Sequence, residues 1–311
     1  MHTHLHEHSC QQEHQKNKKL IWVTILNLSI SLIQIIGGLL SNSLSLLSDS
    51  LHNLGDSTAI VIAFIANKRS KKQPNAKNTF GYKRIEILAA LFNSISLIAI
   101  CIYVVIEAIK HFIYPEPIHG KVMMIVAFLG LLANLLSVFI LHRDKQNNLN
   151  VRALYLHLLG DTLSSIAVIA GGYAIWVYNI IWIDPLITLL IGIYIIYHTW
   201  HIISETISIL MQSTPKTIDV SKIKKTVEQN IEVDNIHHLH IWQLDDNQIH
   251  MEAHINLIED ILLSKAKPIR EKITNQMKIL YNINHVTLQI DYQCCNKKEL
   301  IIKQINQHLK K

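Results

Sequence analysis

The sequence has few charged residues, and this shortage excludes an ordinary soluble domain as the whole of the chain. Asp, Glu, Lys and Arg make up 17% of the 311 residues, against about 25% in a typical soluble domain. Hydrophobic residues make up 50%. Long stretches of the chain therefore carry almost no charge, which indicates a membrane protein.

Two other absences exclude further classes of protein. No CxxC pair occurs and the spacing gives no disulfide framework for the four cysteines, Cys10, Cys101, Cys294 and Cys295. The formal net charge is +6, but no basic stretch is interleaved with aromatic residues, so we expect no nucleic-acid partner. Basic residues that flank apolar spans are instead signals of membrane topology.

Six stretches are long enough to cross a lipid bilayer as helices. A hydrocarbon core of about 30 Å requires about 20 residues at 1.5 Å per residue, and lipid cannot satisfy the backbone of an open sheet. The predicted spans cover residues 20–40, 43–66, 87–106, 122–141, 153–178 and 184–205. We expect Asp184, directly before Pro185, to cap the last of these helices.

Lys and Arg lie mostly on one side of these spans, and this bias predicts the orientation of the chain. Thirteen of them lie before the first span, between the second and third spans, or between the fourth and fifth. The loops on the opposite side have two, Lys110 and Lys121. We therefore expect both termini to lie in the cytoplasm.

The composition changes near residue 213, where polar and charged residues replace the apolar runs. Helical and alternating patterns then follow in the order α-β-β-α-β, which is typical of a small, ferredoxin-like α+β domain. The predicted fold is thus an α-helical membrane protein with six transmembrane helices and a cytoplasmic α+β domain. Its parts are a His-rich cytoplasmic tail (1–19), a transmembrane domain (20–212) and a cytoplasmic domain (213–311).

Ionisable residues inside two of the spans form the same motif twice. His52 and Asp56 in the second span are four residues apart, and His157 and Asp161 in the fifth repeat this spacing. Residues four apart share one face of a helix, and an intramembrane Asp is a candidate functional group. One such pair is often only a structural hydrogen bond. Two pairs on facing helices supply two imidazoles and two carboxylates, which suit tetrahedral Zn²⁺ better than Mg²⁺ or Ca²⁺.

The sequence also supports predictions for three residues near this motif. Gly55 and Gly160 each precede the aspartate, and small residues at these positions are expected to let the two helices approach closely. Asp49 lies on about the same helical stripe as Asp56. It is either an auxiliary group that binds metal or protons in transit, or an interfacial residue near the start of the span.

Other histidines lie outside the membrane spans. The start of the chain is a polar segment, expected to be disordered, whose alternating histidines bind zinc weakly in an accessory role; a purification tag would usually have consecutive histidines. In the cytoplasmic domain, strand alternation predicts that His238 and His240 share one face. On the neighbouring strand, His250 and His254 are expected to share a face in the same way.

Four segments of the sequence resemble parts of the cation diffusion facilitators, a family that exports zinc and related divalent metals. "SLSLLSDSLHNLGDS" looks like the family's second span, and "YLHLLGDTLSSIAVI" looks like its fifth. "TFGYKRIEILAALFN" resembles the segment that leads into its third span. "DPLITLLIGIYIIYHTWHIISETISILMQSTP" resembles its sixth span and the exit into the cytoplasmic domain. The resemblance covers nearly the whole chain.

The resemblance implies export of Zn²⁺ in exchange for protons by a homodimer whose C-terminal domains pack together in the cytosol. The metal would bind His52, Asp56, His157 and Asp161. The sequence does not separate Zn²⁺ from Cd²⁺ and Co²⁺, but in the family two His with two Asp go with zinc. The short loop between the fourth and fifth spans lacks the His-rich insertion of eukaryotic relatives, which indicates a bacterial plasma (inner) membrane.

The resemblance also implies a second metal site in the cytoplasmic domain, where Zn²⁺ would be a regulatory ligand. Matching by motif puts His238, His254 and Asp291 at ligand-like positions. Gln289 and Lys267 stand where some members of the family have His. The alternative is that these are ordinary surface and strand residues.

Two other classes of function provide alternatives to transport. An intramembrane zinc enzyme would need an open metal position and a general base, usually in an HExxH motif. The sequence contains no HExxH. The other alternative is a metal-gated channel or metal sensor without active transport, for which no pore-lining signature is evident.

Overall fold

The computed structural model describes residues 3–142, 149–293 and 300. The chain divides into two compact units. The first contains residues up to 68 together with residues 89–203, and the second contains residues 69–88 together with residues from 204 onward. Each unit is described separately below.

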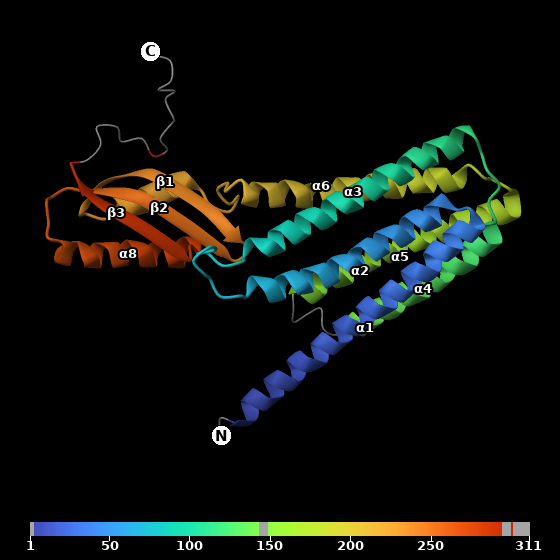
Figure 1. The fold of residues 1–311 in the computed structure, drawn as a ribbon, viewed down its shortest axis with the longest axis horizontal. Coiled ribbons are helices and arrows are strands. Elements are labelled where there is room, and N and C mark those ends of the chain that lie inside the picture. Colours follow the sequence, from blue (N-terminus) through green and yellow to red (C-terminus); the bar gives the residue numbers. More distant parts are fainter. Residues whose placement is uncertain (1–2, 143–148, 294–299, 301–311) are drawn as a thin grey trace, which may run out of the picture. The chain divides into compact units, whose positions relative to one another are not determined.

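Six long helices run through the described residues (Figure 1). They are α1 (Thr3–Ser41), α2 (Leu44–Ser70), α3 (Arg84–Ile113), α4 (Gly120–Leu141), α5 (Leu149–Tyr178) and α6 (Ile183–Leu210). All but α2 contain a stretch that is both long and apolar enough to cross a membrane. Helix α2 is also long, at 27 residues, but its polar and ionisable residues lower its hydropathy. The predicted fold of six membrane helices before an α+β domain is confirmed.

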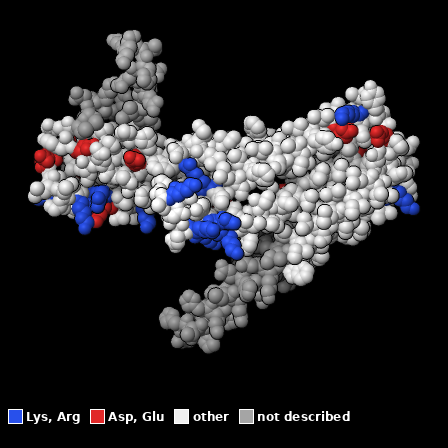
Figure 2. Space-filling view, in the orientation of Figure 1, with Lys and Arg blue, Asp and Glu red and all other residues white. Residues whose placement is uncertain are grey.

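Apolar side chains cover the outside of the helices. Phe64, Phe92, Phe139 and Tyr197, from four different helices, are each more than half exposed. Figure 2 shows a helical surface almost without Lys, Arg, Asp or Glu, and basic side chains that gather where α2 ends and α3 begins. An uncharged, apolar exterior is what a helix requires in contact with lipid.

Glycines allow close helix contacts, but not at the positions that we expected. A Cβ atom on Gly120 of α4 would lie 2.7 Å from the carbonyl oxygen of Gly172 on α5, so this crossing needs glycine. The expectation for Gly160 is wrong, because no described atom lies within 4 Å of a Cβ built there. A Cβ on Gly55 would meet Leu97 of α3 at 3.2 Å, rather than α5.

Helix α1 begins inside the His-rich start of the chain. Its backbone is helical from Thr3, where the sequence had suggested a disordered tail before the first span. The side chains of residues 3–21, including the alternating histidines, lie outside the described residues. The predicted accessory zinc binding by this segment stays a prediction.

The second unit contains a three-stranded sheet and two helices. They follow in the order α7 (Val220–Glu228), β1 (Val233–Asp245), β2 (Gln248–Leu257), α8 (Leu263–Tyr281) and β3 (His285–Tyr292). Strand β2 lies in the centre, antiparallel to β1 and parallel to β3. The order α-β-β-α-β is as predicted. Cys294 and Cys295, which follow β3, lie outside the described residues.

Local signals fix the ends of both helices in this unit. Asp219 caps α7 by accepting hydrogen bonds from the backbone N–H groups of Ser221 and Lys222. Asn282 ends α8 in the left-handed conformation that commonly closes a helix. The helices then bury Ile223, Ile273 and Met277 against the sheet.

Candidate metal centre

His52 and Asp56 on α2 face His157 and Asp161 on α5. The Nε2 atom of His157 lies 2.8 Å from Oδ2 of Asp56 and 3.6 Å from Oδ2 of Asp161. The Nε2 atom of His52 lies 3.3 Å from Oδ2 of Asp56 and 3.8 Å from Oδ1 of Asp161. Each imidazole thus approaches a carboxylate of its own helix and one of the other helix, so the four residues form a single cluster.

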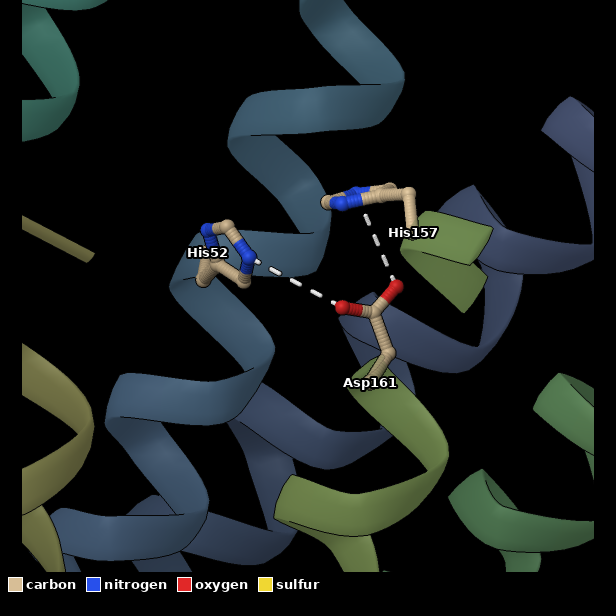
Figure 3. A group of neighbouring side chains, drawn as sticks. All are labelled: His52, His157 and Asp161. Carbon is tan, nitrogen blue, oxygen red and sulfur yellow. Dashed lines mark ion pairs between the residues drawn. The ribbon is translucent and has the colours of Figure 1, made fainter. Parts of the chain in front are cut away.

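The spacing of these donor atoms is close to that of a tetrahedral zinc site. Ligands at about 2.0–2.1 Å from Zn²⁺ in a tetrahedron lie about 3.3 Å from one another, and the four distances above lie on both sides of this value. The donor atoms of His52, His157 and Asp161 all lie within 4.8 Å of one another. Figure 3 shows both imidazoles beside the carboxylate of Asp161. Asp56 lies within reach as the fourth donor.

A cavity borders the cluster and gives a metal ion room to approach. Its volume is about 220 Å³, and its polar lining includes Asn27 of α1 and Asn53, Asp56 and His157. This volume could hold several water molecules at about 30 Å³ each. A partly hydrated metal ion could therefore exchange its waters for the four side chains in steps.

Asp49 lies near the centre but outside this group of ligands. Its side chain is buried, with 1% exposed. One carboxylate oxygen accepts a hydrogen bond from the hydroxyl of Ser164 on α5, and the other has no hydrogen-bond partner. Asp49 therefore joins the two helices that carry the centre without being one of its close donors.

Asp184 on α6 caps α2 and not α6, so our prediction for this residue is wrong. Its carboxylate accepts hydrogen bonds from the backbone N–H of Leu44 at 2.8 Å and from the hydroxyl of Ser43 at 2.6 Å. The backbone N–H of Ser45 also donates to it, at 3.2 Å. These donors belong to the first turn of α2, where N–H groups have no partner within the helix. The start of the site-bearing helix is therefore fixed by a residue 140 positions away.

The cytoplasmic domain contains a second group of donors. The donor atoms of His237, His254 and Asp291 lie within 4.8 Å of one another, with Nδ1 of His254 at 3.3 Å from Oδ2 of Asp291. The motif match had selected His238 in place of His237. A β-bulge between His237 and His240, where His238 has a φ of 52°, shifts the register of β1. The structure thus groups His237 with His254 and Asp291, and the ring of the predicted ligand His238 lies 4.7 Å from that of His254.

His237 has the features of a metal ligand that is ready to bind. Its Nδ1 lies 3.0 Å from Oδ1 of Asn235, and its buried Nε2 has no partner. Burial lowers the pKa of His237, and the neighbouring His254 lowers it further, so the imidazole is held in the neutral form that binds metal. If Nδ1 carries the proton toward Asn235, the lone pair on Nε2 is free for a metal.

Two residues of these sites could not be found from their spacing. His237 is the first of two adjacent histidines, and only the structure shows which of the two has a donor atom near those of both His254 and Asp291. Ser164 follows Asp161 by three residues, so it lies on the same face of α5, but serine in a membrane helix is too common to be a signal. The predicted transport ligands, in contrast, all meet.

Family comparisons cover almost the entire chain. Residues 20–211 match a model described as the cation efflux transmembrane domain. Residues 215–293 match one described as the cytoplasmic domain of cation efflux proteins. The boundary between the two matches lies at the end of α6, where the sequence indicated a change of composition.

Characterised relatives are similar over nearly their full length. A protein named zinc transporter ZitB from Pectobacterium atrosepticum is 37% identical, with 99% of this chain and 94% of the relative covered. ZitB from Escherichia coli is 35% identical over 95% of this chain and 94% of its own length. A cadmium, cobalt and zinc/H⁺–K⁺ antiporter from Bacillus subtilis is 36% identical, with 93% of each chain covered.

Proposed function

The chain belongs to the cation efflux family of membrane transporters, and from this premise we propose that it exports Zn²⁺ from the cytoplasm in exchange for protons. The observation that carries the proposal is the meeting of His52, Asp56, His157 and Asp161 at the spacing of a tetrahedral site. The names of the relatives support zinc as the cargo. One relative is named for cadmium and cobalt as well, which supports Cd²⁺ and Co²⁺ as further cargoes.

The charge of the cluster matches that of the cargo. Two ionised carboxylates and two neutral imidazoles carry a charge of −2, which one Zn²⁺ ion neutralises. Carboxylates in a membrane interior are costly without such a partner. The bound state therefore stabilises a group of residues that would otherwise have to be protonated or hydrated.

Proton exchange follows from the same ligands. Zn²⁺ binds the neutral imidazole and the ionised carboxylate, so metal binding releases protons. An imidazole with an ordinary pKa near 6.5 takes up protons when it meets a more acidic compartment. Protonation of His52 and His157 on the outer side would then weaken metal binding and release the ion.

Transport further requires that the centre open to each side in turn. We infer that α2 and α5 move against the other helices, as in transporters that alternate access around a central site. The bias of Lys and Arg supports cytoplasmic termini. The match to bacterial relatives supports a bacterial plasma membrane, and the cytoplasmic-domain match supports a homodimer.

The cytoplasmic group of His237, His254 and Asp291 is proposed as a regulatory metal site. Its two imidazoles and one carboxylate suit Zn²⁺, and the unpaired Nε2 of His237 supports this role. Such a site would sense cytoplasmic zinc and would not lie on the path of the ion.

Zinc uptake into vesicles tests the transport proposal. The purified chain is reconstituted in liposomes with a pH gradient. Molecules inserted with their cytoplasmic side outward carry zinc into the liposomes, where an enclosed fluorescent indicator detects it. We expect accumulation that depends on the gradient and is lost when His157→Ala is combined with Asp161→Ala. Unchanged flux in that variant would show that the site assignment is wrong.

The pH gradient separates transport from the alternatives. A channel would pass zinc down its own gradient and would ignore an imposed proton gradient. A sensor would bind zinc without flux. Glu107→Gln, at a carboxylate of α3 that pairs with Lys110 at 2.8 Å, is the matched control and should retain the flux of the unmodified protein.

A further inference from the structure

Two buried polar side chains beside the metal centre have polar atoms without a hydrogen-bond partner. Asp49 of α2 and Gln34 of α1 are 1% and 0% exposed. One carboxylate oxygen of Asp49 and both polar atoms of Gln34 have no partner in the described part of the chain. Unpaired polar atoms in the interior of a membrane protein are costly. We therefore expect a hydrogen bond between Asp49 and Gln34 that forms and breaks during the transport cycle.

The surrounding helices hold Gln34 in position. A Cβ atom on Gly130 of α4 would lie 2.1 Å from Nε2 of Gln34, so the amide lies directly against the backbone of α4. On the same helix, Nδ2 of Asn134 lies 3.5 Å from Oγ of Ser165 on α5. Gln34 and Ser165 both lie beside the carboxylate of Asp49. Four helices thus contribute to one buried polar layer.

The charge of this layer depends on a single side chain. Asp49 is its only ionisable member, and α1 and α4 contribute uncharged Gln34 and Asn134. Asp161 of α5 is close enough to Asp49 for the two carboxylates to repel each other when both are ionised. Asp49 forms no hydrogen bond with any of the four metal-site residues. One proton on Asp49 would therefore make the layer neutral, whereas a divalent ion would leave it with a net positive charge.

An amide beside a carboxyl group can serve both protonation states. Gln34 can donate from its N–H₂ group to an ionised carboxylate, or accept at its carbonyl from a protonated carboxyl group. Rotation of the amide by half a turn exchanges the two arrangements. Gln34 can therefore satisfy Asp49 before and after one proton is bound, which neither a hydrocarbon nor a Lys side chain could do.

We propose that Asp49, with Gln34 as its partner, binds one proton that is exchanged against the metal ion. This inference rests on the proposed transport function. When Zn²⁺ arrives at the centre, its positive charge favours ionised Asp49, and the proton on Oδ2 leaves to water. When the ion departs, a proton from water binds Oδ2 again, and the hydroxyl donates to Oε1 of Gln34. No bond other than this O–H bond is formed or broken.

The position of Asp49 suits an exchange with the outer compartment. Asp49 precedes His52 by three residues on α2, and its partner Ser164 follows Asp161 by three residues on α5. With cytoplasmic termini, the start of α2 and the end of α5 both point outward. Asp49 therefore lies one turn outward from the metal ligands, on the side from which protons enter.

Counting the protons released on zinc binding tests the proposal. Zinc is added to the purified full-length protein in weak buffer with a pH indicator, and the release is compared among variants. The number of protons released by the double variant His157→Ala with Asp161→Ala is subtracted from each count. This variant lacks the transport site, so its release reports zinc binding elsewhere on the chain, which all variants share. We expect Asp49→Asn to bind zinc within about threefold of the original affinity and to release about one proton fewer per chain. Glu107→Gln should release the original number.

Two results would overturn the proposal. An unchanged proton count in Asp49→Asn would show that Asp49 carries no exchanged proton, and a loss of zinc affinity above about tenfold would make it a metal ligand instead. If Asp49→Asn does not fold, Gln34→Leu provides the test. It should shift the pH midpoint of zinc-linked release by about half a unit or more, and an unshifted midpoint contradicts the proposal. Unchanged zinc binding in the variant that combines His157→Ala with Asp161→Ala would instead show that the transport-site assignment is wrong.

Discussion

The imidazole of His157 on α5 contacts the carboxylate of Asp56 on α2, with 2.8 Å between Nε2 and Oδ2. This contact crosses between the two helices, whereas the spacing in sequence pairs each histidine with the aspartate of its own helix. The four side chains are consequently interdependent. We therefore expect a change at one of them to alter the position of a side chain on the other helix.

Substitution of Asp56 should therefore affect zinc binding in two ways. Asp56→Ala removes a donor and releases the imidazole of His157, and we expect zinc affinity to fall by more than about 100-fold. Asp56→Asn keeps an oxygen beside His157 but loses the charge, and a smaller fall of about tenfold is expected. Titration with a competing zinc indicator measures both. Equal losses of zinc affinity in Asp56→Ala and Asp56→Asn would show that Asp56 has no separate role in positioning His157.

Removal of the Asp184 cap should destabilise the transmembrane unit. Asp184→Asn loses acceptor capacity for donors in the first turn of α2, and hydrogen bonds to charged groups contribute about 1.5–3 kcal/mol each. Asp219→Asn, at the exposed cap of α7, is the matched control and should cost at most about 1 kcal/mol. Thermal unfolding in detergent compares them. A melting temperature lowered no more by the first variant than by the second would argue against the cap.

His250 should make the stability of the second unit depend on pH. It is buried, and its ring stacks on Trp242 at 5.5 Å and meets Phe80 edge-on at 5.6 Å. Burial lowers the pKa of His250 from 6.5, and nearby His285 lowers it further, whereas Asp245 opposes the shift. The folded unit thus binds a proton less readily than the unfolded chain, so stability falls as the pH drops below about 6.5.

A variant at the same position tests this pH dependence. His250→Phe keeps an aromatic ring against Trp242 and Phe80 but cannot be protonated. Its melting temperature should change less than that of the original protein between about pH 7.5 and pH 5.5. Parallel curves for the two proteins would show that other groups cause the dependence.

The bulge in β1 predicts which histidine binds a regulatory metal. His237→Ala should weaken zinc binding to the cytoplasmic group by about 10-fold to 100-fold, because His237 faces His254 and Asp291. His238→Ala, the matched control, should have a smaller effect. Both are measured in the background of His157→Ala with Asp161→Ala, which removes the transport site. A larger loss in His238→Ala would reverse the assignment.

Much of the centre was predictable because helix periodicity acts over short distances. A spacing of four residues puts His52 near Asp56 and His157 near Asp161 in any α-helix, whatever its neighbours. The two matching pairs then predicted one shared site. The face contacted by Gly160 was not predictable, since that depends on which helix lies opposite, and the described atoms leave open space there.

The sequence by itself determined the apolar spans, the α-β-β-α-β order and the two His–Asp pairs proposed as the transport site, because hydrophobic length and helical or strand period are properties of consecutive residues. Only the tertiary structure decided that Asp184 caps α2, that Asp49 lies beside Gln34, and that His237 lies with His254 and Asp291. The first two contacts join different helices, and the third depends on a bulge that shifts the register of β1.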